Sequence, residues 1–129
     1  MNKPRLLIAD DNEELIELYK TIFEKESFTV IAVADGEEAL RVALEEKPDL
    51  IILDIMMPKK TGLEVLRELK SNPVTSNIPV IILTVLFQKE AQTEAINLGA
   101  SFYLVKEHFS PSDVVKTVKE ELGLNPNKK

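Results

Sequence analysis

Five short apolar runs, each followed by a longer amphipathic segment, constrain what this chain can fold into. The runs are rich in Val, Ile, Leu and Phe and lie near residues 5–10, 28–33, 49–54, 79–84 and 101–106. Short runs of this composition predict buried strands. Strands that alternate with helices are typical of βα units, in which helices cover a parallel sheet. The pattern therefore predicts an α/β fold built from five βα units.

The segments between the runs have the periodicity of surface helices. In each segment, apolar residues recur at intervals of three or four, while charged residues occupy the remaining positions, which predicts an amphipathic helix. The apolar positions are Leu15, Tyr19, Ile22 and Phe23 in the first segment, Ala39, Leu40, Ala43 and Leu44 in the second, Leu63, Leu66 and Leu69 in the third, Ala91, Ala95 and Leu98 in the fourth, and Val114, Val115, Val118 and Leu122 in the fifth.

Capping signals mark the ends of these helices independently of the apolar pattern. The segments Asp35–Glu38 and Thr61–Glu64 each predict a capping box, in which a side-chain oxygen and a glutamate three residues later accept hydrogen bonds from free amides. Ser110 is a predicted N-cap because proline follows it at the first helical position. Gly99 and Gly123 follow helices at positions that favour a left-handed residue.

Length and composition predict one globular domain. The chain has 129 residues, of which 44% are hydrophobic and 29% are charged. These proportions are those of an ordinary folded domain with its own core. We expect a single domain over residues 1–124 and a flexible polar tail over residues 125–129.

The charge balance and the absence of cysteine exclude several functions. A net charge of -6 disfavours direct binding to nucleic acid or to an anionic membrane, because both are polyanions. With no Cys, the chain has no disulfide, thiolate or Cys-based zinc chemistry. The first apolar run is too short for a signal peptide or a membrane span. We therefore expect a cytoplasmic protein that does not associate with a membrane.

Charged residues follow three of the apolar runs. Asp10 and Asp11 follow the first, Asp54 follows the third, and Lys106 follows the fifth. The carboxyl ends of parallel strands meet at one edge of a sheet, so three carboxylates and one ammonium should meet there. Such a combination suits a divalent cation and a phosphoryl group.

These residues, in this order, resemble the receiver domain of two-component response regulators. The resemblance extends from about Arg5 to Leu122 and includes the stretch from Asp35 to Leu40. It implies a flavodoxin-like (βα)5 fold, a doubly wound parallel sheet of five strands in the order 2-1-3-4-5. The motifs that carry it are Asp10-Asp11, Asp54 with Met57-Pro58 and Gly62 after it, Thr84, and Lys106.

The resemblance implies that Asp54 is the phosphoacceptor. A carboxylate can attack phosphorus and form an aspartyl phosphate, a recognised covalent intermediate. Taken alone, Asp54 could equally cap the turn that follows it. The company of Asp10, Asp11 and Lys106 favours the functional interpretation.

The resemblance also implies a Mg²⁺ site. Asp11 and Asp54 would bind the metal directly, the Met56 backbone carbonyl would add a third ligand, and Asp10 would act through water. A cation between three neighbouring carboxylates would offset their mutual repulsion. An alternative for Asp11 is that it caps the first helix.

Lys106 would neutralise one phosphoryl oxygen, and Thr84 would donate its hydroxyl to another. Tyr103 matches the strand-five aromatic that turns inward in similar receivers when the residue at the Thr84 position moves toward the phosphoryl group. A tyrosine suits this role because its ring is apolar and its tip is polar. The alternatives are a solvated lysine, an ordinary β-branched strand residue and a partly buried strand aromatic.

One departure from the receiver pattern affects the loop after Lys106. Most receivers carry proline there, often with a cis bond, whereas this chain has Glu107. Without proline a cis bond costs about 3 kcal/mol, so we predict a trans peptide and a differently set loop.

We interpret the chain as a signalling receiver. It would take a phosphoryl group from a histidine kinase or histidine phosphotransfer protein, catalyse only its own phosphorylation and dephosphorylation, and present a changed surface to a downstream target protein or output domain. The resemblance also allows a phosphorylation-dependent homodimer. A non-phosphorylated pseudo-receiver that acts through protein contact is the alternative.

Two other functions fit the residues less well. A phosphohydrolase of the haloacid dehalogenase type would carry a second acid where Met56 stands. A flavin-binding module would need a Ser-, Thr- and Gly-rich phosphate loop, whereas Asp10 and Asp11 would repel a phosphate.

Overall fold

Five parallel strands form one sheet in the order β2-β1-β3-β4-β5. The structure is a computed structural model that describes residues 3–124, so the predicted tail over 125–129 lies outside the described residues. The predicted fold class and strand order are confirmed. The strands are β1 (Arg5–Ala9), β2 (Thr29–Val33), β3 (Leu50–Leu53), β4 (Val80–Thr84) and β5 (Phe102–Val105).

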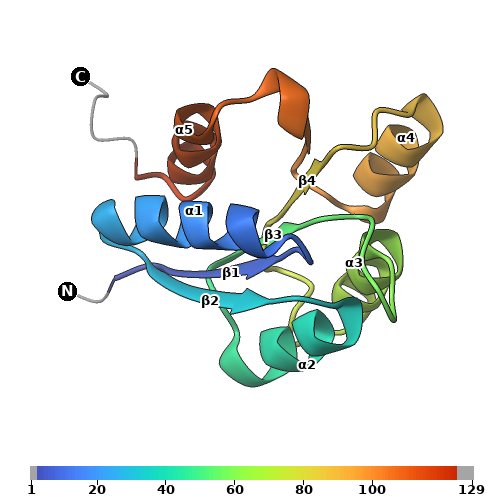
Figure 1. The fold of residues 1–129 in the computed structure, drawn as a ribbon. Coiled ribbons are helices and arrows are strands. Elements are labelled where there is room, and N and C mark those ends of the chain that lie inside the picture. Colours follow the sequence, from blue (N-terminus) through green and yellow to red (C-terminus); the bar gives the residue numbers. More distant parts are fainter. Residues whose placement is uncertain (1–2, 125–129) are drawn as a thin grey trace.

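Helices follow all five strands and cover both faces of the sheet. Figure 1 shows α1 and α5 on one side of the sheet and α2 and α3 on the other. Helix α4 belongs to the second side, because its buried alanines join the same apolar cluster as α2 and α3. The helices are α1 (Glu13–Lys25), α2 (Gly36–Glu46), α3 (Gly62–Ser71), α4 (Lys89–Leu98) and α5 (Pro111–Glu121), with a short 3-10 turn, η1 (Lys106–His108).

The core has two layers because residues along each strand alternate between the faces of the sheet. In β1, Leu6 and Ile8 belong to the cluster beneath α1 and α5, whereas Leu7 and Ala9 belong to the opposite cluster. All four of these residues are buried, so β1 is apolar on both faces, as a strand in a sheet covered on two faces requires.

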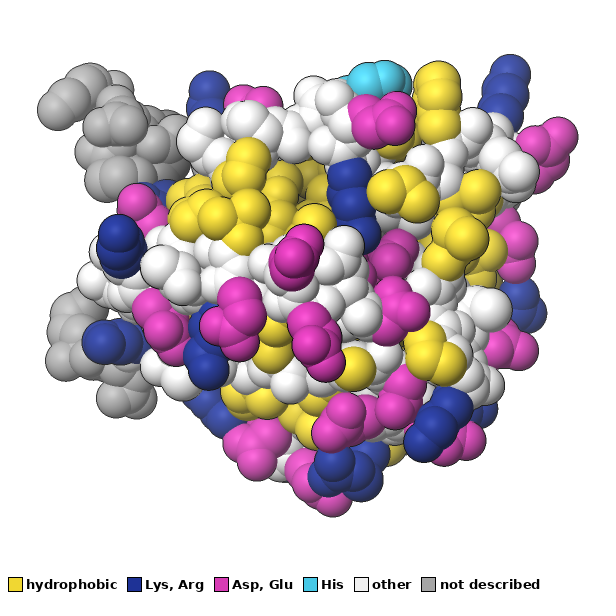
Figure 2. All heavy atoms as spheres, in the orientation of Figure 1, with side chains coloured by type: hydrophobic (Ala, Val, Ile, Leu, Met, Phe, Trp, Pro, Cys, Tyr) yellow, Lys and Arg dark blue, Asp and Glu magenta, His cyan; other side chains and the backbone are white. Residues whose placement is uncertain are grey.

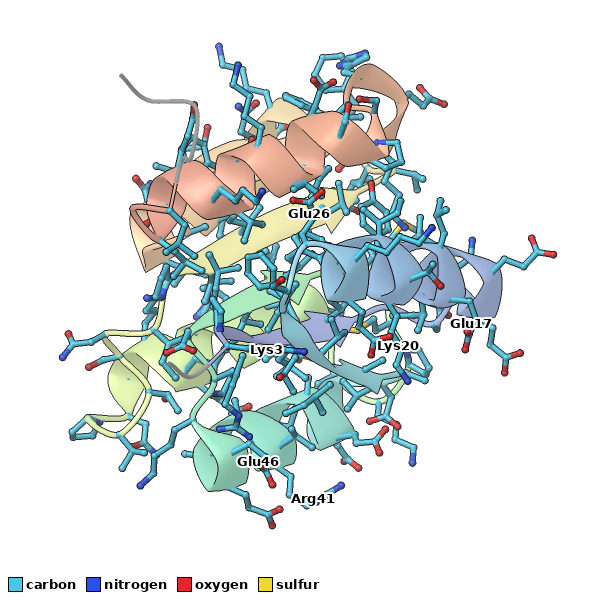
Figure 3. The ribbon with its side chains drawn as sticks, turned by 90° about the vertical axis from the view of Figure 1, so that its left-hand side faces the viewer. Lys3, Glu17, Lys20, Glu26, Arg41 and Glu46 are labelled. Carbon is cyan, nitrogen blue, oxygen red and sulfur yellow. The ribbon has the colours of Figure 1, made fainter. Side chains whose placement is uncertain are left out.

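Ion pairs join elements that are distant in the sequence. Figure 3 labels Glu26, which follows α1 and pairs with Lys119 of α5, and Glu46, the last residue of α2, which pairs with Arg5 of β1. Exposed pairs of this kind contribute about 0–1 kcal/mol each, so they define neighbours more than they stabilise the fold.

Most of the predicted helix ends are confirmed. Thr61 and Ser110 both form capping boxes, with Glu64 and Asp113 as the third residues. Gly99 and Gly123 have φ angles of +112° and +72°, in the left-handed region. The positions of these turns are therefore encoded locally.

The predicted capping box at Asp35 is wrong in its second half. Asp35 accepts from the Glu38 amide at 2.8 Å, as predicted. The Glu38 carboxylate accepts instead from the amide of Ala34, one residue before the cap, at 3.5 Å, while its other oxygen faces the Arg41 guanidinium at 3.7 Å. The Glu38 carboxylate thus faces the Ala34 amide and the Arg41 guanidinium, and neither group belongs to the predicted capping box.

Candidate functional site

Three carboxylates meet at the carboxyl edge of the sheet. Residues Ala9 and Leu53 are register partners in β1 and β3, so the next residues, Asp10 and Asp54, emerge side by side. Asp10 and Asp54 are buried and Asp11 is exposed. One oxygen from each of the three lies within 4.8 Å of the others. The predicted acidic cluster is therefore assembled by the topology.

Lys106 supplies the positive charge within this cluster. Its Nζ donates to Asp10 Oδ2 at 2.8 Å and lies 3.7 Å from Asp54 Oδ2. The lysine side chain is 15% exposed and that of Asp10 is 3% exposed, so the pair is largely desolvated. Charges in such surroundings interact more strongly than at a surface. The structure thus brings Lys106 to the acidic site, as the sequence predicted.

The environment of Asp54 disfavours its ionised form. Burial raises the pKa of Asp54, and so does the negative charge of Asp10, while Lys106, the Thr84 hydroxyl and the Met56 amide lower it by less. A cation at this point would reverse the balance, because it would favour all three carboxylates in their charged form.

The donor set fits Mg²⁺. This ion prefers hard oxygen ligands and is held by a few carboxylates with water completing the shell. The cluster of Asp10, Asp11 and Asp54 offers such oxygens with one exposed member at its mouth. The cluster therefore fits Mg²⁺ in the type of its donor atoms and in their proximity.

Asp11 does not cap the first helix, so that alternative is wrong. The N-cap is Asn12, whose side chain accepts from the Leu15 amide at 3.2 Å. The Asn12 amide in turn donates to Asp10 Oδ1 at 2.9 Å. Asn12 therefore orients Asp10 and begins α1, a role that the sequence analysis did not assign to it.

Asp54 also makes the turn contact proposed as its alternative role. Its Oδ1 accepts from the Met56 amide at a long 3.4 Å. The Met56 side chain is 54% exposed and points away from the core. Capping the turn and facing the cluster are therefore compatible roles for Asp54.

Thr84 and Tyr103 both contact the backbone of Leu86. The Leu86 amide donates to Thr84 Oγ1 at 3.2 Å, and the Tyr103 hydroxyl donates to the Leu86 carbonyl at 2.6 Å. Thr84 is fully buried and Tyr103 is 8% exposed. Leu86 could not be predicted from the sequence, because a backbone contact has no signature in the pattern of side chains.

The predicted trans peptide after Lys106 is confirmed. All peptide bonds within the described residues are trans, and Lys106, Glu107 and His108 form the turn η1. The loop therefore leads directly from the site to the start of α5.

Acidic side chains dominate the face that carries α1. Figure 2 shows Asp and Glu gathered over α1, β2 and α2, with Lys and Arg interspersed. This face has the character that the net charge predicts and does not offer a basic surface to a nucleic acid. Within residues 3–124, moreover, no helix combines the length and apolarity needed to cross a membrane.

We expect Asp54→Asn to stabilise the metal-free protein at neutral pH. The pKa of Asp54 is raised above 3.8 in the folded protein, so the folded chain binds a proton more readily than the unfolded chain. The free energy of unfolding therefore falls as the pH rises from the unfolded pKa of Asp54 through its raised folded pKa. Asparagine has no charge to bury, so the free energy of unfolding of the variant should exceed that of the parent protein by about 0.5–2 kcal/mol at pH 7. Urea unfolding from pH 3 to 8 checks this, and a gain that persists at the acid end would contradict the explanation.

The fold and the site together define a class of α/β domain with an acidic cluster at the carboxyl edge of a five-stranded parallel sheet. The family model described as the response regulator receiver domain matches residues 6–119. The chain belongs to this family of two-component response regulator receivers.

Curated relatives include the alkaline phosphatase synthesis transcriptional regulatory protein PhoP of Bacillus subtilis and the transcriptional regulatory protein CpxR of Escherichia coli. Each is 40% identical over 119 residues, which is 92% of this chain and 48% of the relative. The chain therefore spans about half the length of these relatives.

Solved structures agree with the fold. A CheY-like receiver domain protein from Methanospirillum hungatei has a TM-score of 0.89 at 27% identity, with 96% of this chain and 97% of that chain covered. A chain of the CheX–CheY–BeF3–Mg²⁺ complex from Borrelia burgdorferi has a TM-score of 0.86 at 27% identity, with 94% and 90% covered.

Proposed function

We propose that this receiver is a Mg²⁺-dependent phosphorylation switch with Asp54 as the phosphoacceptor. The observation that carries the proposal is the buried Asp54 carboxylate beside Asp10 and 3.7 Å from the Lys106 ammonium. An acceptor needs nearby positive charge, because a phosphoryl group adds about -1.5 to -2 charge.

The transfer joins an Asp54 carboxylate oxygen to phosphorus. When the donor is a phosphohistidine, the phosphorus–nitrogen bond breaks as the phosphorus–oxygen bond forms, and the imidazole nitrogen keeps the electron pair. Lys106 would turn from Asp10 toward the new phosphoryl oxygen, and the Thr84 hydroxyl would donate to another. Both groups already lie at the site, so little reorganisation is needed.

Bound Mg²⁺ would supply positive charge to the transferring oxygens. Asp11, Asp54 and the Met56 backbone carbonyl would hold it directly, and Asp10 would act through water. The proximity of the three carboxylates supports this assignment.

The partners follow from the family. The donor would be a histidine kinase or histidine phosphotransfer protein, and the readout would be made by a downstream target protein or output domain, with a phosphorylation-dependent homodimer as a further state. The curated relatives are named as transcriptional regulators and are about twice as long, which supports an output domain in those proteins. We expect a cytoplasmic switch that catalyses only its own phosphorylation and dephosphorylation.

Intact mass after incubation with Mg²⁺ and acetyl phosphate tests the proposal. We expect one added phosphoryl group in the parent protein and none in Asp54→Ala or in a chelated sample. Because fast hydrolysis could hide an adduct, the same samples are titrated with beryllofluoride, a phosphoryl mimic, and amide chemical shifts near Thr84 are followed. If neither adduct nor shift appears in the folded parent protein, the pseudo-receiver is the better account.

A further inference from the structure

An aromatic pair bridges the two loops that flank the site. Phe87 lies between β4 and α4, and His108 lies in η1 after β5. Their ring centroids are 5.3 Å apart at an interplanar angle of 80°, an edge-to-face contact. Phe87 is 69% exposed, so the contact is not enforced by the core.

The pair is one residue from the backbone that Thr84 and Tyr103 hold. Leu86 accepts from Tyr103 through its carbonyl and donates to Thr84 through its amide, and Phe87 follows it directly. Thr84 contacts the peptide group before Leu86, and Tyr103 contacts the peptide group between Leu86 and Phe87. A change in the position of Phe87 can therefore bias Tyr103 through the shared peptide group and Thr84 through the one next to it.

The β4–α4 loop has little other restraint at its far end. The N-cap of α4 is Gln88, which makes no side-chain capping hydrogen bond. Helices whose first amides lack a cap begin less firmly than capped ones. By contrast α1, α2, α3 and α5 all have side-chain caps. The Phe87–His108 contact thus restrains the residue that precedes this helix start without a side-chain cap.

The loop is held in an arrangement that suits a phosphoryl group on Asp54. Thr84 ends β4, the strand next to the one that Asp54 follows, and it is fully buried with its Oγ1 accepting from the Leu86 amide. The Tyr103 ring is buried and its hydroxyl donates to the Leu86 carbonyl. Both side chains are thus placed for the phosphorylated site before any phosphoryl group is present.

We propose that Phe87 and His108 form a latch that holds the β4–α4 loop in the phosphoryl-ready arrangement. The latch regulates the proposed phosphorylation site and rests on that proposed function. Its members are positioning residues, because they act through Leu86 and do not contact Asp54. The apparent affinity for a phosphoryl mimic depends on the fraction of molecules in the competent arrangement, so the latch raises that affinity.

The size of the effect follows from the contact. Edge-to-face pairs favour one state of a two-state equilibrium by roughly two- to tenfold. Opening the latch should therefore weaken binding of beryllofluoride by roughly that factor. It should leave the Asp10, Asp11 and Asp54 cluster in place.

The test is calorimetric titration of the full chain with beryllofluoride at saturating Mg²⁺. We expect Phe87→Ala and His108→Ala each to weaken binding by roughly two- to tenfold. The double variant should be no weaker than either single variant, because the two rings act as one contact. His108→Phe keeps an aromatic ring and should bind like the parent protein. Phe102→Ala removes another exposed aromatic, away from the site, and is the matched control.

A second readout follows the loop directly. Amide hydrogen exchange at Leu86 in the ligand-free protein should accelerate in Phe87→Ala and His108→Ala and return toward the parent rate in His108→Phe. Single variants that bind as tightly as the parent protein, or more tightly, would overturn the latch while leaving the switch intact. A folded parent protein that does not bind beryllofluoride would overturn both.

Discussion

Lys106→Met should lower the free energy of unfolding of the metal-free protein by about 3 kcal/mol at neutral pH. The lysine is the cation within hydrogen-bond distance of Asp10, whose side chain is 3% exposed, and its loss would leave buried carboxylates uncompensated. Breaking a buried pair by removing one partner typically costs about 3–5 kcal/mol. Denaturant unfolding measures the change directly.

The destabilisation should depend on the charge of the cluster. It should shrink in acid, where protonation of Asp54, whose pKa is raised by burial and by Asp10, removes a negative charge from the cluster. Saturating Mg²⁺ should recover much of the loss. Lys59→Met is the matched control, since its Nζ lies 3.8 Å from Asp35 but its side chain is 60% exposed, and it should cost less than about 1 kcal/mol. Equal losses in the two variants would show that the Lys106 pair has no special role.

Gly62→Ala should be the most disruptive single-methyl change at this edge of the sheet. A Cβ at Gly62 would lie 2.1 Å from the carbonyl oxygen of Asp54, and the Gly62 amide already donates to Ile55 at 2.8 Å. Both neighbours are backbone atoms, so the loop after β3 must move as a whole. We expect a loss of about 3 kcal/mol or more and weaker Mg²⁺ binding, because the moving loop carries Asp54 and Met56.

Gly123→Ala is the control for this prediction. Its φ is +72°, but apart from the glycine and its chain neighbours no atom of residues 3–124 lies within 4 Å of the added carbon. It should therefore cost only about 1–2 kcal/mol through backbone strain and leave Mg²⁺ affinity unchanged. Thermal unfolding and a metal titration of both variants separate steric displacement of the site from a general glycine effect. Similar Mg²⁺ affinities in Gly62→Ala and Gly123→Ala would contradict the prediction that Gly62→Ala displaces the site.

The fold could be predicted from the sequence because its signals are local and agree with one another. Apolar runs mark the strands, three- and four-residue spacing marks the helices, and Thr61 and Ser110 mark two helix starts. The resemblance then supplied the strand order, which periodicity alone does not specify. The half-wrong capping box shows the limit, since a motif cannot say that Glu38 will be shared with Arg41.

The site was predictable for a different reason. Once strands are parallel, the residues after them must meet at one edge, so the sequence alone predicts that Asp10, Asp54 and Lys106 lie together. Which carboxylate Lys106 contacts could not be predicted, because its flexible side chain can reach more than one carboxylate of the cluster. The structure places it on Asp10 at 2.8 Å.

The sequence by itself determined the elements, the sheet edge and the charged residues that face one another across it. These follow from side-chain period and residue type, which are properties of short segments. Only the tertiary structure decided that Asn12 caps α1 and that Phe87 contacts His108. It also decided that the Leu86 backbone donates to Thr84 and accepts from Tyr103. Such contacts join backbone groups and loops distant in the chain, and they exist only after the strands have been packed in register.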